Sequence, residues 1–461
     1  MGPLLLSLLL QIQEPRERLE TAIRETKLEE AQIALALLQA ADGARAARAI
    51  LVNLARWRER QAQLLLATVQ SRAAYDGLDS SMFTFNLEEE KTRQKALAVA
   101  RDRVQTACRT ALDGEKIYAA LLRTLGSLRP EAVPVLSAEA IRTANWVSRA
   151  EILEALGAMG AKADIQVVVE REKEPAVIAV GLGAVPLDRA VEYLAHPQWQ
   201  VRLAAVRSLG ESRGAVGMLA QGLGEMDLRM RNAAVRTLTS LTRTELPPDP
   251  TAWKDWWRAN GDDFREGRYS PGTAKAAAGP GRTTFYGMPV LSSRVCFVID
   301  RSGSMRQPGR YDVACRELKR QIEALPDGAR LNLIFFGATQ SCFSAAPTRV
   351  LDRAARKEAL DFVDRQTFEA GTDLYAALEK ALSFVGSPDS GRLREDGPDT
   401  IIVLSDGQAN VGRLVDDELV ARVIARRSHW IGPAIHTVTL SSEAKSLKML
   451  AEFTGGVSTS K

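Results

Sequence analysis

A change in hydrophobic pattern near Leu291 constrains the fold of this chain more than any other feature. Beyond this residue, short runs that are apolar throughout alternate with amphipathic segments of helical period. Strands that are apolar on both faces and separated by helices predict a mostly parallel sheet covered on both sides. We expect strands at 295–299, 331–336, 401–404 and 435–440, and helices at 313–325, 353–364, 375–385 and 418–427. The pattern therefore predicts a doubly wound, Rossmann-like α/β domain over residues 291–461.

Polar residues are concentrated where two of these strands end. The first strand runs into DRSGS at 300–304, and the third runs into SDG at 405–407. Between them, GTD at 371–373 leads from a loop into a helix. Ligands of an open parallel sheet bind outside the carboxyl ends of its strands. We therefore expect these three segments to meet in one site.

Together these segments resemble the metal-ion-dependent adhesion site (MIDAS) of the von Willebrand factor A superfamily, whose order is DxSxS, Thr, Asp. The resemblance covers residues 291–461, where AEFTGG at 451–456 also matches the family's last helix and turn. It implies a complete site that holds Mg²⁺, with Mn²⁺ as an alternative. The implied metal ligands are Asp300, Ser302, Ser304, Thr372 and Asp406.

The family pattern also implies how the ion would be used. The three hydroxyls are neutral ligands, and the two carboxylates bind directly or hold coordinated waters, which suits the oxygen shell that Mg²⁺ prefers. Neutral ligands leave the ion electrophilic, so an acidic side chain of a protein partner can complete its coordination. Asp373 is interpreted as a helix cap or supporting residue. Arg301, Met305 and Arg306 are expected to border the binding surface.

The first part of the chain has the composition of long helices. Residues 14–145 are rich in Ala, Leu, Glu, Arg and Gln, with apolar residues at three- and four-residue spacings. Asp42-Gly43 is a turn signal, and the segment 75–86 breaks the pattern with aromatic, Ser, Asp and Gly residues. We predict about three helices folded back on one another as an antiparallel bundle or coiled-coil stalk.

A weak internal repeat follows at 146–260. Stacking its segments by their helical ends places Leu156, Leu182, Leu209 and Leu238 in equivalent positions. The pattern resembles short HEAT repeats, which form an α-solenoid with an extended surface for partners. It predicts a second interaction surface beside the metal site.

The repeat is followed by a Trp-rich segment and a linker. The three tryptophans of TAWKDWWRAN at 251–260 fall on one helical face and are expected to seal the end of the solenoid. Residues 261–290 are interpreted as a flexible linker, because their centre is rich in Gly, Ala and Pro without periodicity. Such a linker would let the two halves reorient.

The amino terminus carries an apolar stretch, Pro3–Ile12, with the length of a secretory signal core. No basic residue precedes it and no small-x-small cleavage site follows it. Two interpretations therefore stay open. Residues 1–13 are either a signal or membrane-tethering segment, which places the protein in the cell envelope or outside, or the start of a buried helix in a cytoplasmic protein.

Composition and motifs argue against two other classes of function. With 61 basic and 57 acidic residues, the net charge of +4 gives no strong field for attracting nucleic acid. The sequence contains no GxxxxGK, GxSxG or HExxH motif, and its four cysteines lack metal-site spacing, so we do not expect an enzyme. The Arg- and Ala-rich composition indicates a GC-rich bacterial genome.

Two alternatives come from domain order. Helical repeats joined to such an α/β domain also resemble, in outline, the Ro ribonucleoprotein family, which binds small RNAs. Some bacterial relatives of the α/β domain serve instead as adaptors for a separate AAA-type ATPase. The primary prediction is a metal-dependent binding or scaffold protein.

Overall fold

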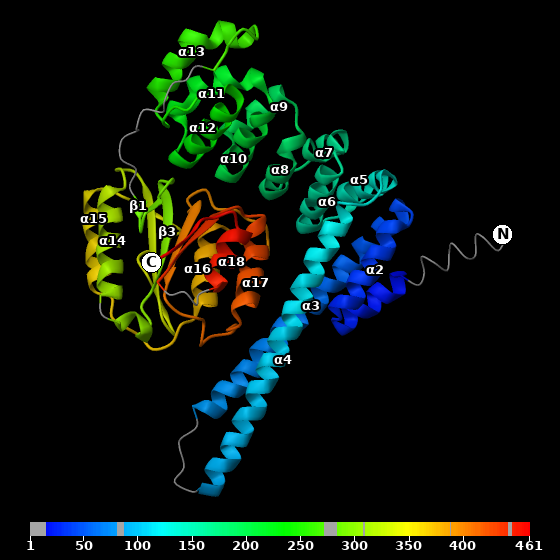
Figure 1. Ribbon diagram of the computed structural model, residues 1–461, viewed down its shortest axis with the longest axis vertical. Helices are drawn as coiled ribbons and strands as arrows, with labels where there is room; N and C mark the ends of the chain where they lie inside the picture. The colour runs from blue at the N-terminus through cyan, green and yellow to red at the C-terminus, as the bar shows by residue number, and fades with distance from the viewer. Residues whose placement is uncertain (1–14, 81–86, 272–283, 308, 388, 441–444) are drawn as a thin grey trace, which may run out of the picture.

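The computed structural model describes all residues except 1–14, 81–86, 272–283, 308, 388 and 441–444. The predicted signal segment therefore lies outside the described residues. A helical region comes first and a mixed α/β domain follows it (Figure 1). Of the helices that the structure describes, none is both long and apolar enough to cross a bilayer.

Two long helices, α3 (Gly43–Asp79) and α4 (Leu87–Leu125), form an antiparallel hairpin. It is preceded by a helix at 15–25 and by α2 (Leu28–Ala40). Asp42 caps α3 by accepting from the backbone N–H of Arg45 at 2.9 Å, which fits the predicted turn. Near α2, the hairpin is held by Trp57, which stacks on Tyr118 with ring centroids 4.2 Å apart.

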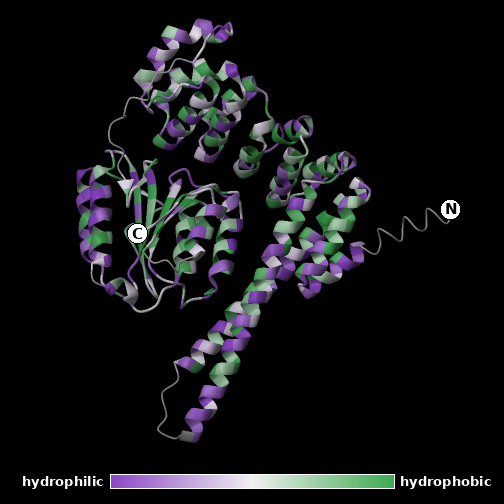
Figure 2. Cartoon of the chain, in the orientation of Figure 1, coloured by the Kyte–Doolittle hydropathy of each residue, from purple (hydrophilic) through white to green (hydrophobic). Residues whose placement is uncertain are grey.

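The predicted break at 75–86 is wrong over 75–79, because α3 continues to Asp79. The ion pair between Arg72 and Asp76, one turn apart at 2.8 Å, supports the helix where Asp and Gly suggested its end. Residues 81–86 lie outside the described part. The hairpin extends past the edge of the α/β domain, and its far end is mostly hydrophilic (Figures 1 and 2).

Short helices then stack in sequence from α5 to α13. The four leucines that define the repeat are each at most 1 % exposed. Trp253 of α13 is fully buried, and Trp257 lies against Gly217 of α11, so α13 covers this end of the stack. The helices are α5 (Val133–Arg142), α6 (Trp146–Ala158), α7 (Lys162–Val169), α8 (Pro175–Gly181), α9 (Leu187–Glu192), α10 (Trp199–Ser208), α11 (Val216–Gly222), α12 (Leu228–Thr242) and α13 (Pro250–Arg265).

Ordered elements occupy both ends of the predicted 261–290 linker. Helix α13 continues to Arg265 because Phe264 is buried among its aromatic residues. At the other end, β1 (Thr284–Phe285) and β2 (Met288–Pro289) pair antiparallel, and the ring of Phe285 packs on Phe297 at 5.2 Å. The centre of the predicted linker, 272–283, lies outside the described residues.

The main sheet is mixed, with order β5-β4-β3-β7-β8-β9, and β6 also pairs with β4. The prediction of a mostly parallel sheet is confirmed, since only β5 and β6 run antiparallel to their neighbour. The strands are β3 (Arg294–Asp300), β4 (Arg330–Phe336), β5 (Gln340–Cys342), β6 (Arg349–Val350), β7 (Thr400–Ser405), β8 (Ala434–Thr439) and β9 (Ser458–Ser460).

Helices cover both faces of this sheet (Figure 1). On β3, Phe297 belongs to the core under α14 (Arg310–Ala324) and α15 (Arg353–Asp364). The next residue, Val298, belongs to the core under α16 (Leu374–Val385), α17 (Asp417–His429) and α18 (Lys445–Phe453). Burial on both faces explains why the strands are apolar throughout. The strands form the hydrophobic centre of the domain (Figure 2).

The helical region packs against the α/β domain, whereas the linker led us to expect halves that reorient. Arg426 of α17 pairs with Glu115 of α4 at 2.9 Å and lies over the ring of Trp57. Gln200 of α10 donates to the carbonyl oxygen of Ile431 at 3.3 Å. One hydrophobic cluster contains residues of both halves. Polar side chains of the helices therefore find partners in the other half.

Candidate metal centre

The site begins where the adjacent strands β3 and β7 end. Asp300 is the last residue of β3, and Ser405 is the last residue of β7. The Ser405 hydroxyl donates to one carboxylate oxygen of Asp300. The backbone N–H of Ser302 donates to the other at 2.7 Å. Both oxygens of Asp300 are thereby fixed at the carboxyl edge of the sheet.

A chain of hydrogen bonds continues from this carboxylate to the second one. The hydroxyls of Ser302 and Ser304 are 3.0 Å apart, and the Ser304 hydroxyl donates to Oδ1 of Asp406 at 2.7 Å. Ser304 lies in the 3-10 turn η7 (Gly303–Arg306), which brings the DRSGS loop back over the strand end. The structure thus brings four of the five predicted site residues into one hydrogen-bonded cluster.

Thr372 reaches the same loop region through Asn410. Its backbone N–H donates to Oδ1 of Asn410 at 2.9 Å, and its carbonyl accepts from the Asn410 N–H at 3.1 Å. Asp373, next in sequence, caps α16 by accepting from the N–H of Ala376 at 2.9 Å, as its interpretation as a helix cap requires. Gly371 precedes them with φ of 80°, a conformation that favours glycine. Thr372 is buried.

The two carboxylates of the cluster lie in different electrostatic surroundings. Burial is the main cause that raises the pKa of Asp300 to about 6; the nearby Asp406 raises it further, and hydrogen bonds from Ser405 and Ser302 oppose the shift. Asp406 faces Arg310, whose guanidinium donates to Oδ2 at 2.7 Å. Among the described residues, no cationic side chain pairs with Asp300. Negative charge is therefore left uncompensated on the β3 side of the cluster.

This donor set fits a hard divalent cation. Carboxylate and hydroxyl oxygens are the ligands that Mg²⁺ and Mn²⁺ prefer, whereas nitrogen and sulfur ligands select softer metals. Nowhere in the described part of the chain do three His, Cys, Asp or Glu side chains gather as a metal site. A cation held here would need the serine and threonine hydroxyls as well as the carboxylates.

Three residues that sequence reasoning did not place in the site contact it. Ser405 orients Asp300, Arg310 pairs with Asp406, and Asn410 holds Thr372. The signal for Ser405 was present, because a hydroxyl residue ends an otherwise apolar strand beside another strand end. Arg310 and Asn410 carry no spacing signal, since their contacts arise only from the tertiary fold.

The predicted border of the site needs one correction. Met305 is fully buried in the core beneath α14, because the turn η7 directs this apolar side chain inward. Arg301 pairs with Glu369 at 2.8 Å, and Arg306 lies over the ring of Phe368. The two arginines remain partly exposed beside the cluster.

Comparison with known proteins places a family in this part of the chain. The model of the von Willebrand factor type A (VWA) domain matches residues 295–408. Inter-alpha-trypsin inhibitor heavy chain H3 of Homo sapiens is 31% identical over 160 residues, which cover 33% of this chain and 18% of that protein. Calcium-activated chloride channel regulator 1 of Sus scrofa is 26% identical over 200 residues, which cover 43% and 19%. The chain thus spans less than a fifth of either relative.

Solved structures give weaker matches. A von Willebrand factor type A protein from Catenulispora acidiphila is 22% identical, covers 38% of this chain and 39% of its own, and has a TM-score of 0.31. Proximal thread matrix protein 1 from the mussel byssus, in a form with a zinc-occupied MIDAS motif, is 19% identical, covers 37% and 43%, and has a TM-score of 0.29. A VWA domain at 295–408, preceded by a helical region, is the organisation of this chain.

Proposed function

Taking the VWA domain at 295–408 as a premise, we propose that this protein binds a protein partner through a divalent cation. Mg²⁺ is the expected ion, and Mn²⁺ is the alternative. The observation that carries the proposal is the hydrogen-bonded cluster of oxygen ligands at the carboxyl ends of β3 and β7, in which Asp300, Ser302 and Asp406 are buried and Ser304 is exposed. The residues that would hold the ion are Asp300, Ser302, Ser304, Thr372 and Asp406.

The hydrogen bonds of the cluster leave lone pairs for an ion. A serine hydroxyl that donates its proton to Asp406, as Ser304 does, keeps its oxygen free to accept or to coordinate. Asp300 is oriented in advance by Ser405 and by the N–H of Ser302. Bound there, the cation would offer an open coordination position to a carboxylate oxygen of the partner.

The test is a calorimetric titration of the full chain with MgCl₂ and MnCl₂. We expect saturable binding of one ion, which Asp300→Asn and Ser304→Ala weaken or abolish. Asp312→Asn, an exposed carboxylate change on α14, is the matched control and should bind as the unaltered protein does. If the control loses binding with the others, or if the unaltered chain binds no ion, the proposal fails.

The stacked helices α5–α13 support a HEAT-like interpretation and a second partner surface. The sides of α10 and α12 that face the VWA domain form hydrogen bonds with it, so a protein partner would use the outward surface of the helical stack. We propose a binding protein rather than an enzyme. An RNA-binding role and an adaptor role for an AAA-type ATPase stay predictions, distinguished by retardation of small RNAs or by co-purification with an ATPase.

A further inference from the structure

A cleft lies at the opposite end of the sheet from the proposed metal site. It has a volume of about 510 Å³ and separates helices α10 and α12 from the amino ends of β7 and β8. Arg207 of α10, Arg229 and Arg236 of α12 and His436 of β8 line it, together with the end of α18. Among the residues that the structure describes, no Asp or Glu lines this cleft. Ligand sites often lie where two units of a protein meet.

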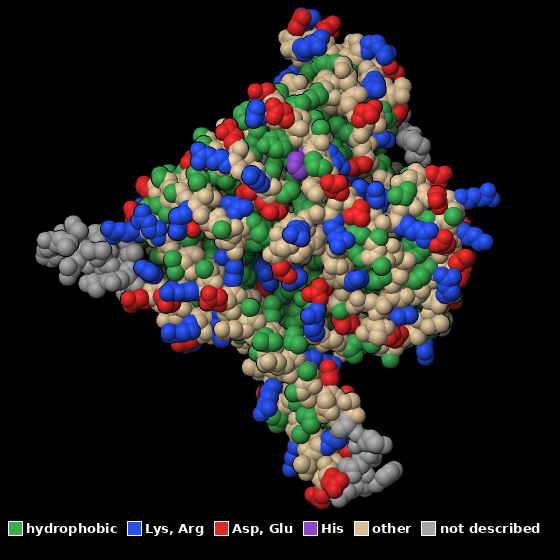
Figure 3. Space-filling model, turned by 180° about the vertical axis from the view of Figure 1, so that it is seen from behind, with side chains coloured by type: hydrophobic (Ala, Val, Ile, Leu, Met, Phe, Trp, Pro, Cys, Tyr) green, Lys and Arg blue, Asp and Glu red, His purple; other side chains and the backbone are tan. Residues whose placement is uncertain are grey.

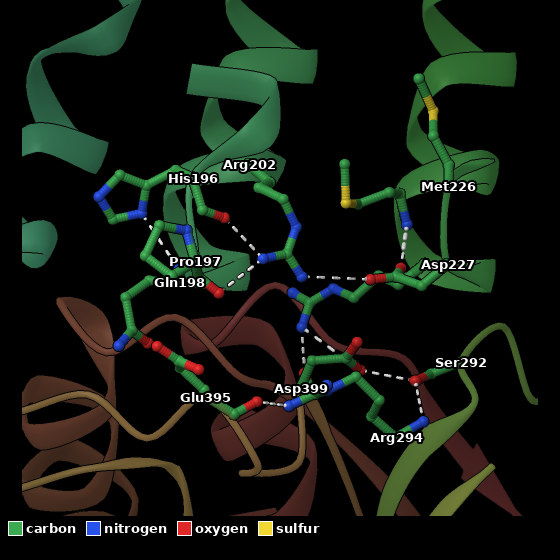
Figure 4. Close-up of polar contacts among 12 residues, drawn as sticks. His196, Pro197, Gln198, Arg202, Met226, Asp227, Ser292, Arg294, Glu395 and Asp399 are labelled. Atoms are coloured by element: carbon green, nitrogen blue, oxygen red, sulfur yellow. Dashed lines mark hydrogen bonds and ion pairs between the residues drawn. The ribbon is translucent and has the colours of Figure 1, made fainter. Parts of the chain in front are cut away.

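Two carboxylates that face arginines of this region, Asp399 and Asp227, are already engaged. Arg229 lies 3.8 Å from Asp399 and donates to the carbonyl oxygen of Gly432 at 3.2 Å. Asp227 faces Arg202 at 3.9 Å. Asp399 also accepts from the hydroxyl of Ser292 at 2.6 Å, and this network spans the interface between the two halves (Figure 4). These two carboxylates thus already face Arg229 and Arg202.

Arg207 and Arg236 lack such partners. Of the residues that the structure describes, none forms a hydrogen bond or ion pair with either guanidinium. Partial burial lowers the pKa of Arg207, and the charges of Arg229 and Arg236 lower it further. Both side chains are exposed at the cleft and can meet a ligand. Two like charges are thus held together without compensation.

We infer that this cleft binds the phosphate group of a small phosphorylated molecule. The guanidiniums of Arg207 and Arg236, which pair with no described residue, match the charge of roughly −2 that a phosphate monoester carries, whereas one carboxylate would neutralise only half of it. Guanidinium is also the group whose geometry suits bidentate contact with phosphate. Nδ1 of His436 accepts from the N–H of Val457 at 3.0 Å, so Nε2 carries the proton and can donate to a ligand.

The size of the cleft favours a small molecule over a nucleic acid. Its volume falls within the range of about 300–1,000 Å³ that is typical of small-ligand sites. A nucleic acid would need a basic surface that continues along its backbone. On the face of the molecule that Figure 3 shows, acidic and basic side chains are interspersed.

The test is calorimetry on the full chain in a buffer free of phosphate and sulfate, with inorganic phosphate and pyrophosphate as probes. We expect saturable binding at one site, with pyrophosphate the tighter probe. Arg207→Gln with Arg236→Gln should weaken it about tenfold or more for each arginine. Arg258→Gln is the matched control, because this exposed arginine of α13 lies outside the cleft and pairs with Asp255, one turn before it. No saturation, or equal affinity in the double variant, would overturn the inference.

A second measurement separates a ligand site from a structural role. Without probe, the double variant should have the same or a higher Tm, because the substitutions remove repulsion between like charges. Pyrophosphate should raise the Tm of the unaltered chain, by mass action, and leave that of the double variant unchanged. A lower Tm without probe contradicts the charge argument. Binding of an RNA oligonucleotide, lost in the double variant while pyrophosphate does not bind, would replace the small molecule with RNA.

Discussion

The guanidinium of Arg72, on helix α3, donates a hydrogen bond of 3.0 Å to the backbone oxygen of Asn410. Asn410 is also the residue whose side chain accepts from the N–H of Thr372. The helical hairpin is therefore separated from a predicted metal ligand by a single residue. This contact makes the hairpin part of the support of the proposed metal site.

Arg72→Ala should weaken binding of Mg²⁺ about tenfold without abolishing it. Residues that orient a metal ligand through hydrogen bonds typically affect affinity by about 10- to 100-fold, and Arg72 acts one residue further away than Asn410. Calorimetric titration with MgCl₂ measures the change. Arg103→Ala, an exposed arginine of α4, is the control. Unchanged affinity in Arg72→Ala would show that the hairpin does not support the site.

Arg310→Gln should have the opposite effect on the affinity for Mg²⁺. Its guanidinium lies 2.7 Å from Asp406 and competes there with a cation for the same carboxylate. Removing this charge should tighten Mg²⁺ binding several-fold while lowering the stability of the metal-free protein. Calorimetric titration with MgCl₂ measures the affinity, and the midpoint of urea unfolding with and without MgCl₂ measures the stability. Weaker binding in the variant would mean that Arg310 positions Asp406 instead of competing for it.

Arg426→Ala should destabilise the protein by about 2–3 kcal/mol. Loss of one partner of a buried ion pair costs about 3–5 kcal/mol, and this value is reduced because the Arg426 side chain is 26% exposed, although Glu115 is only 3% exposed. Urea unfolding gives the free energy. Arg109→Ala, an exposed change on α4, should leave it nearly unaltered. If the two variants unfold alike, the contact between α4 and α17 does not stabilise the fold.

The lowered pKa of His436 predicts that the protein loses stability in mild acid. Burial, aided by the charge of Arg229, lowers its pKa from 6.5 to about 4, so the folded state resists a proton that the unfolded state accepts. As pH falls from 6.5 towards 4, stability is lost, by about 2 kcal/mol at pH 5. Unfolding free energies at pH 7 and pH 5 measure this difference. His436→Gln should reduce it, whereas His429→Gln, an exposed histidine, should not.

The α/β domain could be predicted closely because its strands are buried on both faces. The predicted helix at 353–364 has the bounds of α15, and 331–336 lies within β4. The positions of Asp300 and Asp406 also follow from strand ends, which the sequence marks by a change from apolar to polar residues. The hydrophobic pattern of the sequence was sufficient to predict an element wherever buried residues recur at the spacing of a strand or helix.

Contacts between distant segments could not be predicted in the same way. Arg229 and Arg426 look like solvated helix residues, yet both make ion pairs across the interface between the two halves. Asn410 looks like an ordinary loop residue, although it connects Thr372 with Arg72. The partners of Arg229 and Arg426 lie more than 150 residues away in the sequence, and the contacts of Asn410 depend on how its loop packs. The hydrophobic period of the sequence carries no information about such contacts.

The hairpin also limits the shape of a protein partner that can reach the proposed metal site. Cys108 of α4 lies close to Asp416, beside the carboxyl end of the sheet. The part of α4 before Cys108 begins at Leu87 and is roughly 30 Å long at 1.5 Å per residue. It projects beyond the edge of the domain (Figure 1). A protein partner with a broad, flat surface would contact this part of α4 before it reached the cluster. We therefore expect partners that present a narrow, protruding loop.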